Sequence, residues 1–184
     1  MFQSFTDPHA PKVKGAVTQL LGINNAGVAV GFYNDAAGNS HAFQVNQATG
    51  VFTAIRIPGD VSTLATGINN LGDIVGFGTD ASGVTTSWLL HAGHLTAYQH
   101  PGGSDTTALG INDRDEIVGS YLDGAGVLHG FTLKAPLGPV SRWQKIDDPN
   151  GVGSTVVNGL NNAGDLVGFY TDAAGNTDGM LATP

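Results

Sequence analysis

Acidic and imidazole side chains recur at a fixed spacing in this chain. Aspartate stands six residues before histidine at Asp35 and His41, and again at Asp123 and His129. The glycine three residues after each aspartate favours a tight hairpin, so the two side chains should face each other across paired strands. Such a pair can act as general acid and base, or can only stabilise the hairpin. The sequence marks no nucleophile beside either pair.

Two aspartates, Asp172 and Asp178, occupy the same two positions near the C-terminus. Like charges across one hairpin either bind a cation or raise the pKa of one carboxyl group, so these residues are the candidate metal ligands. Calcium prefers six to eight oxygen ligands, and the loop pattern typical of calcium sites is absent. His91 and His94 lack the further partners that zinc needs, and we expect them in an exposed turn. No cofactor motif is found, and we expect no cofactor.

These spacings belong to a longer repeat. Gly-Ile-Asn-Asn occurs at 22–25 and 67–70, Gly-Ile-Asn-Asp at 110–113, and Gly-Leu-Asn-Asn at 159–162, so successive copies are 45, 43 and 49 residues apart. A period in the forties, with short strands and glycine turns, is typical of propeller blades of four strands each. The sequence therefore predicts an all-β, four-bladed β-propeller with four antiparallel strands per blade.

Each repeat predicts its strands through its turns. The first strand runs from a threonine to Gly-Ile-Asn, and the second is a β-branched and aromatic run such as 29–33. The third strand contains His-Ala-Phe at 41–43 in the first repeat and the equivalent residues in the other repeats. The fourth, at 52–58 in the first repeat, is apolar at its first and fourth positions and ends on proline, as suits an outer edge strand.

The fourth strand recurs at 95–101 and 143–149 but is missing after the last repeat. The same template stands at the other end of the chain, in Phe2-Gln-Ser-Phe-Thr-Asp-Pro8. We therefore predict that residues 2–8 pair in the last blade, remove two open sheet edges and close residues 1–184 into one domain.

The string Gly-Ile-Asn, Val-Gly, Asp-x-x-Gly and His-Ala/Gly-Phe resembles the repeat of the bacterial HAF-repeat family, whose His-Ala-Phe stands here at His41 to Phe43. The resemblance spans nearly the whole chain and implies extracellular repeat proteins, mostly without assigned activity. It brings no catalytic residues. The chain departs from the pattern at Thr86 and Asp178, where histidine is missing, and at Asp115, where the turn glycine is missing.

Polar residues on the innermost strands and at one channel mouth form the candidate ligand site. The asparagine of each Gly-Ile/Leu-Asn can line the axial channel as a ring, or can cap its own turn. Loops that join the outer strand of one blade to the inner strand of the next gather at one mouth. The candidate ligand-binding residues are Asn24, Asn69, Asn112 and Asn161, with His9, Lys12, Lys14, Asp60, His100, Asp105, Asp147 and Asp148 at the mouth.

Breaks in the repeat give further candidates. The loop before the first repeat is longer than its counterparts, and an insertion at 134–143 separates the third and fourth strands of the third repeat. Gly78 replaces the tyrosine that recurs at Tyr33, Tyr121 and Tyr170. A gap in a series of bulky residues predicts a pocket there.

Charge and composition exclude several function classes. Seven Lys and Arg against fifteen Asp and Glu give a net charge of −8, and no basic run suits nucleic acid or an anionic membrane. No apolar run approaches a membrane span, the first residues lack signal-peptide features, and cysteine is absent. By the resemblance we expect an extracellular or periplasmic protein, with a cytoplasmic one as the alternative.

We expect a non-enzymatic β-propeller module that binds a small molecule, glycan or protein. The alternatives are a hydrolase or lyase with acid and imidazole groups at the channel mouth, and an assembly unit that joins another disc through exposed apolar rims.

Overall fold

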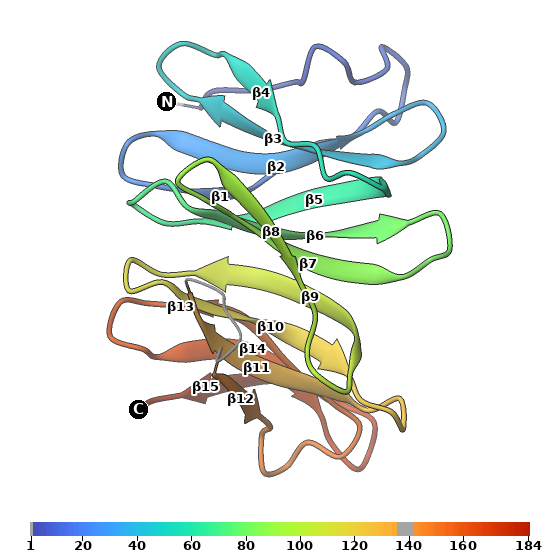
Figure 1. Ribbon diagram of the computed structural model, residues 1–184, viewed down its shortest axis with the longest axis vertical. Helices are drawn as coiled ribbons and strands as arrows, with labels where there is room; N and C mark the ends of the chain where they lie inside the picture. Colours follow the sequence, from blue (N-terminus) through green and yellow to red (C-terminus); the bar gives the residue numbers. More distant parts are fainter. Residues whose placement is uncertain (1, 136–141) are drawn as a thin grey trace.

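The computed structural model describes residues 2–135 and 142–184, which form β-strands joined by turns (Figure 1). No helix among these residues has the length and apolar character needed to cross a membrane. The strands are β1 (Thr18–Ile23), β2 (Val28–Asn34), β3 (Ser40–Asn46), β4 (Phe52–Ala54), β5 (Asp60–Ile68), β6 (Ile74–Asp80), β7 (Thr85–His91), β8 (His94–Tyr98), β9 (Ser104–Ile111), β10 (Glu116–Leu122), β11 (Leu128–Lys134), β12 (Trp143–Ile146), β13 (Ser154–Leu160), β14 (Leu166–Thr171) and β15 (Thr177–Ala182).

The strands form two four-stranded sheets and one curled seven-stranded sheet. The first two sheets are β1 to β4 and β5 to β8, each an antiparallel meander. The third sheet joins β9 to β12 with β13 to β15 through one parallel pair, Leu128 with Ser154. The prediction of an all-β chain is confirmed, but the prediction of four closed blades is wrong.

The ring does not close, because the four repeats are stacked in an open row along the long axis of the molecule. The N-terminus lies toward one end of this row and the C-terminus toward the other (Figure 1). Residues 2–8 form no strand, and the Phe5 ring contacts the Phe52 ring of the first repeat edge-on, with centroids 6.5 Å apart. Among the described residues, β15 pairs with β14 alone.

Side chains between successive repeats explain the open row. One layer of apolar residues fills each gap, and the sheets lie nearly face to face in Figure 1. Neighbouring sheets therefore rotate too little for four of them to complete a circle. The second strand shows how the side chains alternate. The valine of its Val-Gly faces the following repeat, and the residue before this valine faces the preceding repeat. The buried clusters are Val30, Ala42, Ala65, Ile68, Ile74 and Trp88 between repeats one and two, Val75, Leu89, Ala108, Ile111, Ile117 and Phe131 between two and three, and Val118, Val157, Leu166 and Met180 between three and four.

The innermost strands approach one another at glycine. A Cβ atom added to Gly67 would lie 3.1 Å from the Cα atom of Gly110, and one added to Gly22 or Gly110 would be 3.3 or 3.4 Å from the Cα atom of the next glycine in the series. Only a residue without a side chain allows this spacing at no distortion. The glycine of the repeat is therefore a packing requirement between repeats.

The asparagine of the repeat joins the same strands. The Asn24 side-chain amide donates to the Asn69 carbonyl (3.2 Å), that of Asn69 to the Asn112 carbonyl (3.2 Å), and that of Asn112 to the Asn161 carbonyl (3.0 Å). Each side-chain oxygen accepts N–H groups of its own turn, as Asn69 does from Leu71 and Asp73. The interpretation that each asparagine caps its own turn is confirmed. The side-chain amides of Asn24, Asn69 and Asn112 also join neighbouring repeats.

We predict that Asn69→Ala destabilises the protein more than Asn161→Ala. Both changes remove a turn cap, but only Asn69 is buried and donates to the next repeat. The expected losses in free energy of unfolding are about 3 and about 1.5 kcal/mol, because a buried unsatisfied group adds about 1 to 3 kcal/mol to the loss of a cap. Urea denaturation measures both. Equal losses would contradict the inter-repeat role.

Candidate functional site

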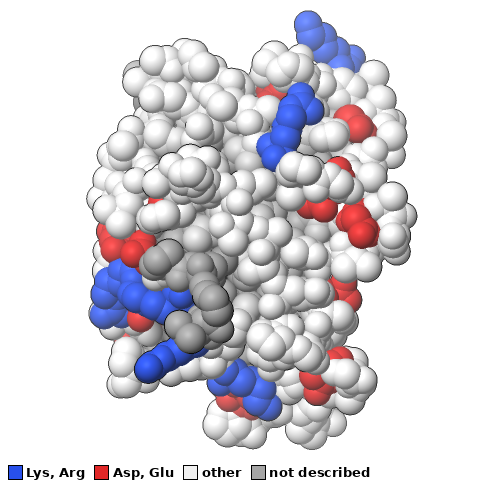
Figure 2. All heavy atoms as spheres, viewed as in Figure 1, with Lys and Arg blue, Asp and Glu red and all other residues white. Residues whose placement is uncertain are grey.

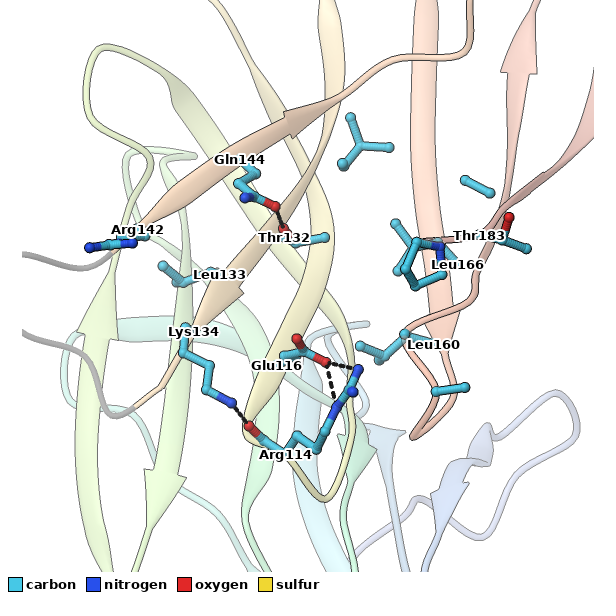
Figure 3. Close-up of a pocket in the computed structure, with 15 residues that line it drawn as sticks. Arg114, Glu116, Thr132, Leu133, Lys134, Arg142, Gln144, Leu160, Leu166 and Thr183 are labelled. Carbon is cyan, nitrogen blue, oxygen red and sulfur yellow. Dashed lines mark hydrogen bonds and ion pairs between the residues drawn. The ribbon is translucent and has the colours of Figure 1, made fainter.

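A cleft of about 480 Å³ opens between the third and fourth repeats. Its apolar wall comes from β11, β12, β13 and β14, with Leu133, Ile146, Leu160 and Leu166 (Figure 3). Its polar residues come from the β9–β10 turn, from β10 and β11, from the start of β12 and from the residue that follows β15. This volume and an apolar lining with few polar groups are typical of sites for small molecules.

The Asn112 turn positions the charged end of the cleft. The Asn112 side-chain oxygen accepts the backbone N–H groups of Arg114 and Glu116, which fixes the start of β10. Glu116 then lies opposite Lys134 in the antiparallel β10–β11 register. The Lys134 ammonium donates to the Arg114 carbonyl, and Figure 3 shows both side chains at this end of the cleft.

Positive charge exceeds negative charge around the cleft. Arg114, Lys134 and Arg142, three of the seven basic residues of the chain, line it together with Glu116. The Arg114 guanidinium lies 2.8 Å from the Glu116 carboxylate, while Lys134 and Arg142 have no carboxylate partner among the described residues. On the face in Figure 2, basic side chains gather over the half that holds the third and fourth repeats.

Glu116 is ionised at neutral pH. Partial burial alone raises the pKa of Glu116, but hydrogen bonds from Asn112 and Arg114 and the charges of Arg114 and Lys134 together hold it below its ordinary value. Its charge offsets that of Arg114. The remaining field of the cleft is therefore that of the Lys134 and Arg142 cations.

The predicted acid and imidazole pairs are present. The His41 Nε2 atom lies 2.9 Å from the Asp35 carboxylate, and the His129 Nε2 atom lies 3.2 Å from that of Asp123. His129 has a second carboxylate, because its Nδ1 atom lies 2.9 Å from Asp147. Both ring nitrogens of His129 are thus engaged.

His100 serves as an aromatic packing group. Its ring stacks on the Tyr121 ring with centroids 3.6 Å apart and planes 6° apart, and it contacts the Trp143 ring edge-on. Burial lowers the pKa of His100, so its ring is neutral at pH 7. The sequence placed His100 at a channel mouth, and the structure places it in the third repeat beside His129.

The other predicted mouth residues lie in separate repeats, because no closed ring brings them together. His9 pairs with Asp7 (2.9 Å) on the first repeat, and Lys12 and Lys14 lie in the exposed loop before β1. The carboxylate of Asp105 accepts the Thr85 N–H group (3.3 Å), and that of Asp148 accepts the Asn150 N–H group (2.9 Å). Ligand binding by these residues stays a prediction.

The expected pocket at Gly78 is filled. The Asp60 carboxylate occupies the space that a side chain at Gly78 would take, 1.8 Å from the position of its Cβ atom. Burial, with the nearby charge of Asp80, raises the pKa of Asp60. The small residue in the second repeat therefore accommodates a carboxylate from the first residue of β5.

The proposed metal pair gains no further ligand. No group of three or more His, Asp or Glu side chains suited to a metal ion occurs in the described part of the chain. The Asp172 carboxylate accepts the N–H groups of Ala174 and Asn176 in its own turn, and hydrogen bonds from Asn176 lower the pKa of Asp172. Metal binding by Asp172 and Asp178 stays a prediction.

Sequence reasoning missed the cleft, although it marked the insertion beside it. Residues 136–141 of that insertion lie outside the described residues, whereas Lys134 and Arg142 at its two ends line the cleft. Two basic residues that flank an insertion in an acidic chain were the available signal. The expected ligand position was at the opposite ends of the strands, so the site prediction and the cleft differ.

The chain was compared with known proteins. No family model matches it, and no curated protein matches it either. The solved structure of TolB from Acinetobacter baumannii, a six-bladed propeller, superposes on 90% of this chain with a TM-score of 0.67 and 12% identity. The fold is propeller-like. This chain covers 41% of that TolB chain, which is less than half its length.

A second solved structure, a variant of AofleA from Arthrobotrys oligospora, superposes with a TM-score of 0.48 and 12% identity. The match covers 89% of this chain and 54% of that one. At 12% identity the TolB match shows the fold alone.

We predict that the Asp35 carboxyl titrates at low pH. The hydrogen bond with His41 lowers the pKa of Asp35 from 3.8 to about 2, with smaller contributions from the Asn39 and Ala37 N–H groups. A lowered folded pKa stabilises the protein above the unfolded value, and this stabilisation is lost as pH falls from about 4 through about 2. NMR titration of the carboxyl carbon measures the midpoint. In His41→Gln the midpoint should move upward, and an unchanged midpoint would contradict the pairing.

Proposed function

We propose that this protein is a non-enzymatic binding module whose cleft between the third and fourth repeats takes a small ligand with an apolar body and an anionic group. One observation carries the proposal. An apolar cleft of about 480 Å³ is lined by three of seven basic residues in a chain of net charge −8. Basic side chains that are scarce elsewhere converge where a ligand fits.

The lining residues define the chemistry of this ligand. Ile146 and Leu160, which are only partly buried, offer apolar surface, on which burial contributes about 25 cal/mol per Å². Thr132 and Gln144, hydrogen-bonded to each other at 3.2 Å, offer neutral polar groups. The Lys134 ammonium suits a carboxylate, sulfate or phosphate, and Glu116 disfavours a second negative charge beside Arg114. A carboxylate on an aliphatic chain meets all of these requirements.

The His129 cluster favours binding over catalysis. A general base needs a free nitrogen to accept a proton from substrate. Both nitrogens of His129 face carboxylates, at 3.2 Å from Asp123 and 2.9 Å from Asp147. No hydroxyl group among the described residues is hydrogen-bonded to this ring. The location outside the cytoplasm that the repeat resemblance implies is part of this proposal.

We predict that hexanoate binds the cleft and hexylamine does not. The two probes share their apolar chain, so the difference isolates the charge of the rim. Lys134→Gln should weaken hexanoate binding by about threefold to tenfold, the effect of roughly 1 kcal/mol from one charge-assisted contact. NMR titration measures the affinity and shows whether the amide signals of Leu133 and Leu160 shift.

Lys12→Gln is the matched control, because it removes the same charge from an exposed loop of the first repeat. It should leave hexanoate affinity unchanged. Equal weakening by both variants, or equal binding of hexylamine, would show that net charge rather than the cleft governs the interaction. Absence of any shift at Leu133 and Leu160 would overturn the proposed site.

A further inference from the structure

One end of the row exposes positions that are buried at every junction between repeats. The valine of Val-Gly faces the following repeat, and Val30, Val75 and Val118 are 0% exposed. Its counterpart in the last repeat, Val167, is 49% exposed. On the third strand, Leu89 is 2% exposed whereas Leu181, at the same position, is 70% exposed. The last repeat thus presents an apolar face shaped for a following repeat, here called the tail face.

The other end presents the complementary face. The second residue after the repeat's threonine faces the preceding repeat, and Ala65, Ala108 and Val157 are 0% exposed at this position. Their counterpart in the first repeat, Leu20, is 42% exposed, and Ile23 is 60% exposed. We call this surface the head face. The head face and the tail face therefore correspond to the two surfaces that meet at a junction between repeats.

The hydrogen bonds between repeats also stop at these faces. The Asn161 side-chain amide, which has no following carbonyl in the chain, donates to Asp165 at 2.7 Å. The Asn24 carbonyl receives no side-chain amide among the described residues, although the three later asparagines each do. A following Asn24 carbonyl would complete the series, and Gly159 leaves room for the close approach of a following Gly22.

A missing strand points the same way. In the first three repeats the third strand pairs with a fourth, and β15 has no fourth strand among the described residues. At the head face, the Asp7 N–H group donates to Thr18 Oγ1 (3.4 Å), as His100 does to Thr106 (2.9 Å). The second half of the 2–8 segment therefore lies in the position that the end of a fourth strand takes at each junction between repeats. Residues 2–4 are exposed, Phe2 fully so, and the Gln3 side-chain amide donates to the Gln47 carbonyl of the first repeat (3.4 Å).

We propose that two copies of this chain associate head to tail, with the head face of each on the tail face of the other, and close a ring of eight repeats. The two faces differ, so the contact is heterologous, and a ring is the arrangement that satisfies both faces of both copies. Closure within one chain is excluded by the open row, whereas a second copy supplies the missing strand. The proposal is independent of the ligand in the cleft.

The observed pairings fix the register of this contact. Val45 pairs with Phe52, and Leu133 pairs with Trp143, in the first and third repeats. By the same register, Ala182 of one copy pairs with Phe2 of the other, and Leu181 pairs with Gln3. The new strand adds to the open edge of β15.

Mass measurement tests the association. Light scattering after size exclusion should give twice the 18.8 kDa of one chain, and Val167→Asp should give 18.8 kDa because it places a charge in the tail face. Val84→Asp is the matched control, since Val84 is 47% exposed against 49% for Val167 but lies in a hairpin away from both faces. Thermal unfolding of each variant confirms that it is folded.

Mixing two variants tests the polarity of the contact. Leu20→Asp alters only the head face and Val167→Asp only the tail face, so each alone should be monomeric. A mixture restores one contact between an intact head and an intact tail, and should form a heterodimer. If either variant alone remains dimeric, the contact is not head to tail.

Cross-linking tests the register. The chain contains no cysteine, so Gln3→Cys with Leu181→Cys introduces the only thiols. Oxidation should join two chains covalently, whereas Gln3→Cys with Val84→Cys should not be joined. A monomeric wild-type chain well above micromolar concentration would overturn the proposal and assign both faces to further repeats of a longer protein. A series of larger open assemblies would overturn the closed ring.

Discussion

The close approach of the innermost strands at glycine is the constraint on which the rest of the structure depends. A Cβ atom at Gly67 would lie 3.1 Å from Gly110, so the backbones there are nearly in contact. This spacing brings the Asn69 side-chain amide within reach of the Asn112 carbonyl and sets the distance between sheets that one layer of apolar side chains fills. The fixed distance explains why this glycine and this asparagine stand in all four repeats.

Local features of the fold were predictable because short segments determine them. The spacing of Asp35 and His41 implied their hairpin and their contact, which is 2.9 Å, and turn capping was one of two interpretations of Asn24. Ring closure was not predictable in this way. Residues 2–8 match the fourth-strand template, and a fourth strand contacts two neighbours, the third strand of its own repeat and the first strand of the repeat that follows. Within one chain residues 2–8 reach only the first strand that follows them. The rotation between repeats depends on how side chains pack between whole sheets, so the spacing of residues in the sequence does not determine it.

The cleft could not be predicted from the repeat, because it arises where one repeat differs in side-chain volume and charge. In the second repeat the corresponding place holds the buried Leu89, and the His91 Nδ1 atom lies 3.0 Å from the Asp73 carboxylate. In the third repeat Thr132 replaces that leucine and Lys134 replaces that histidine. A smaller neutral side chain and a longer cation leave the space open and charged. The binding site is thus a local departure within a regular framework.

The separation of the two chain ends within one molecule tests the open row most directly. Spin labels on Ser4→Cys and Thr183→Cys, in a chain diluted into excess unlabelled protein, report only this intramolecular distance. The account predicts a distance near the length of the whole row, far above the spacing of about 5 Å between neighbouring strands. A distance typical of adjacent strands would contradict it, because residues 2–8 would then complete the last sheet of their own chain.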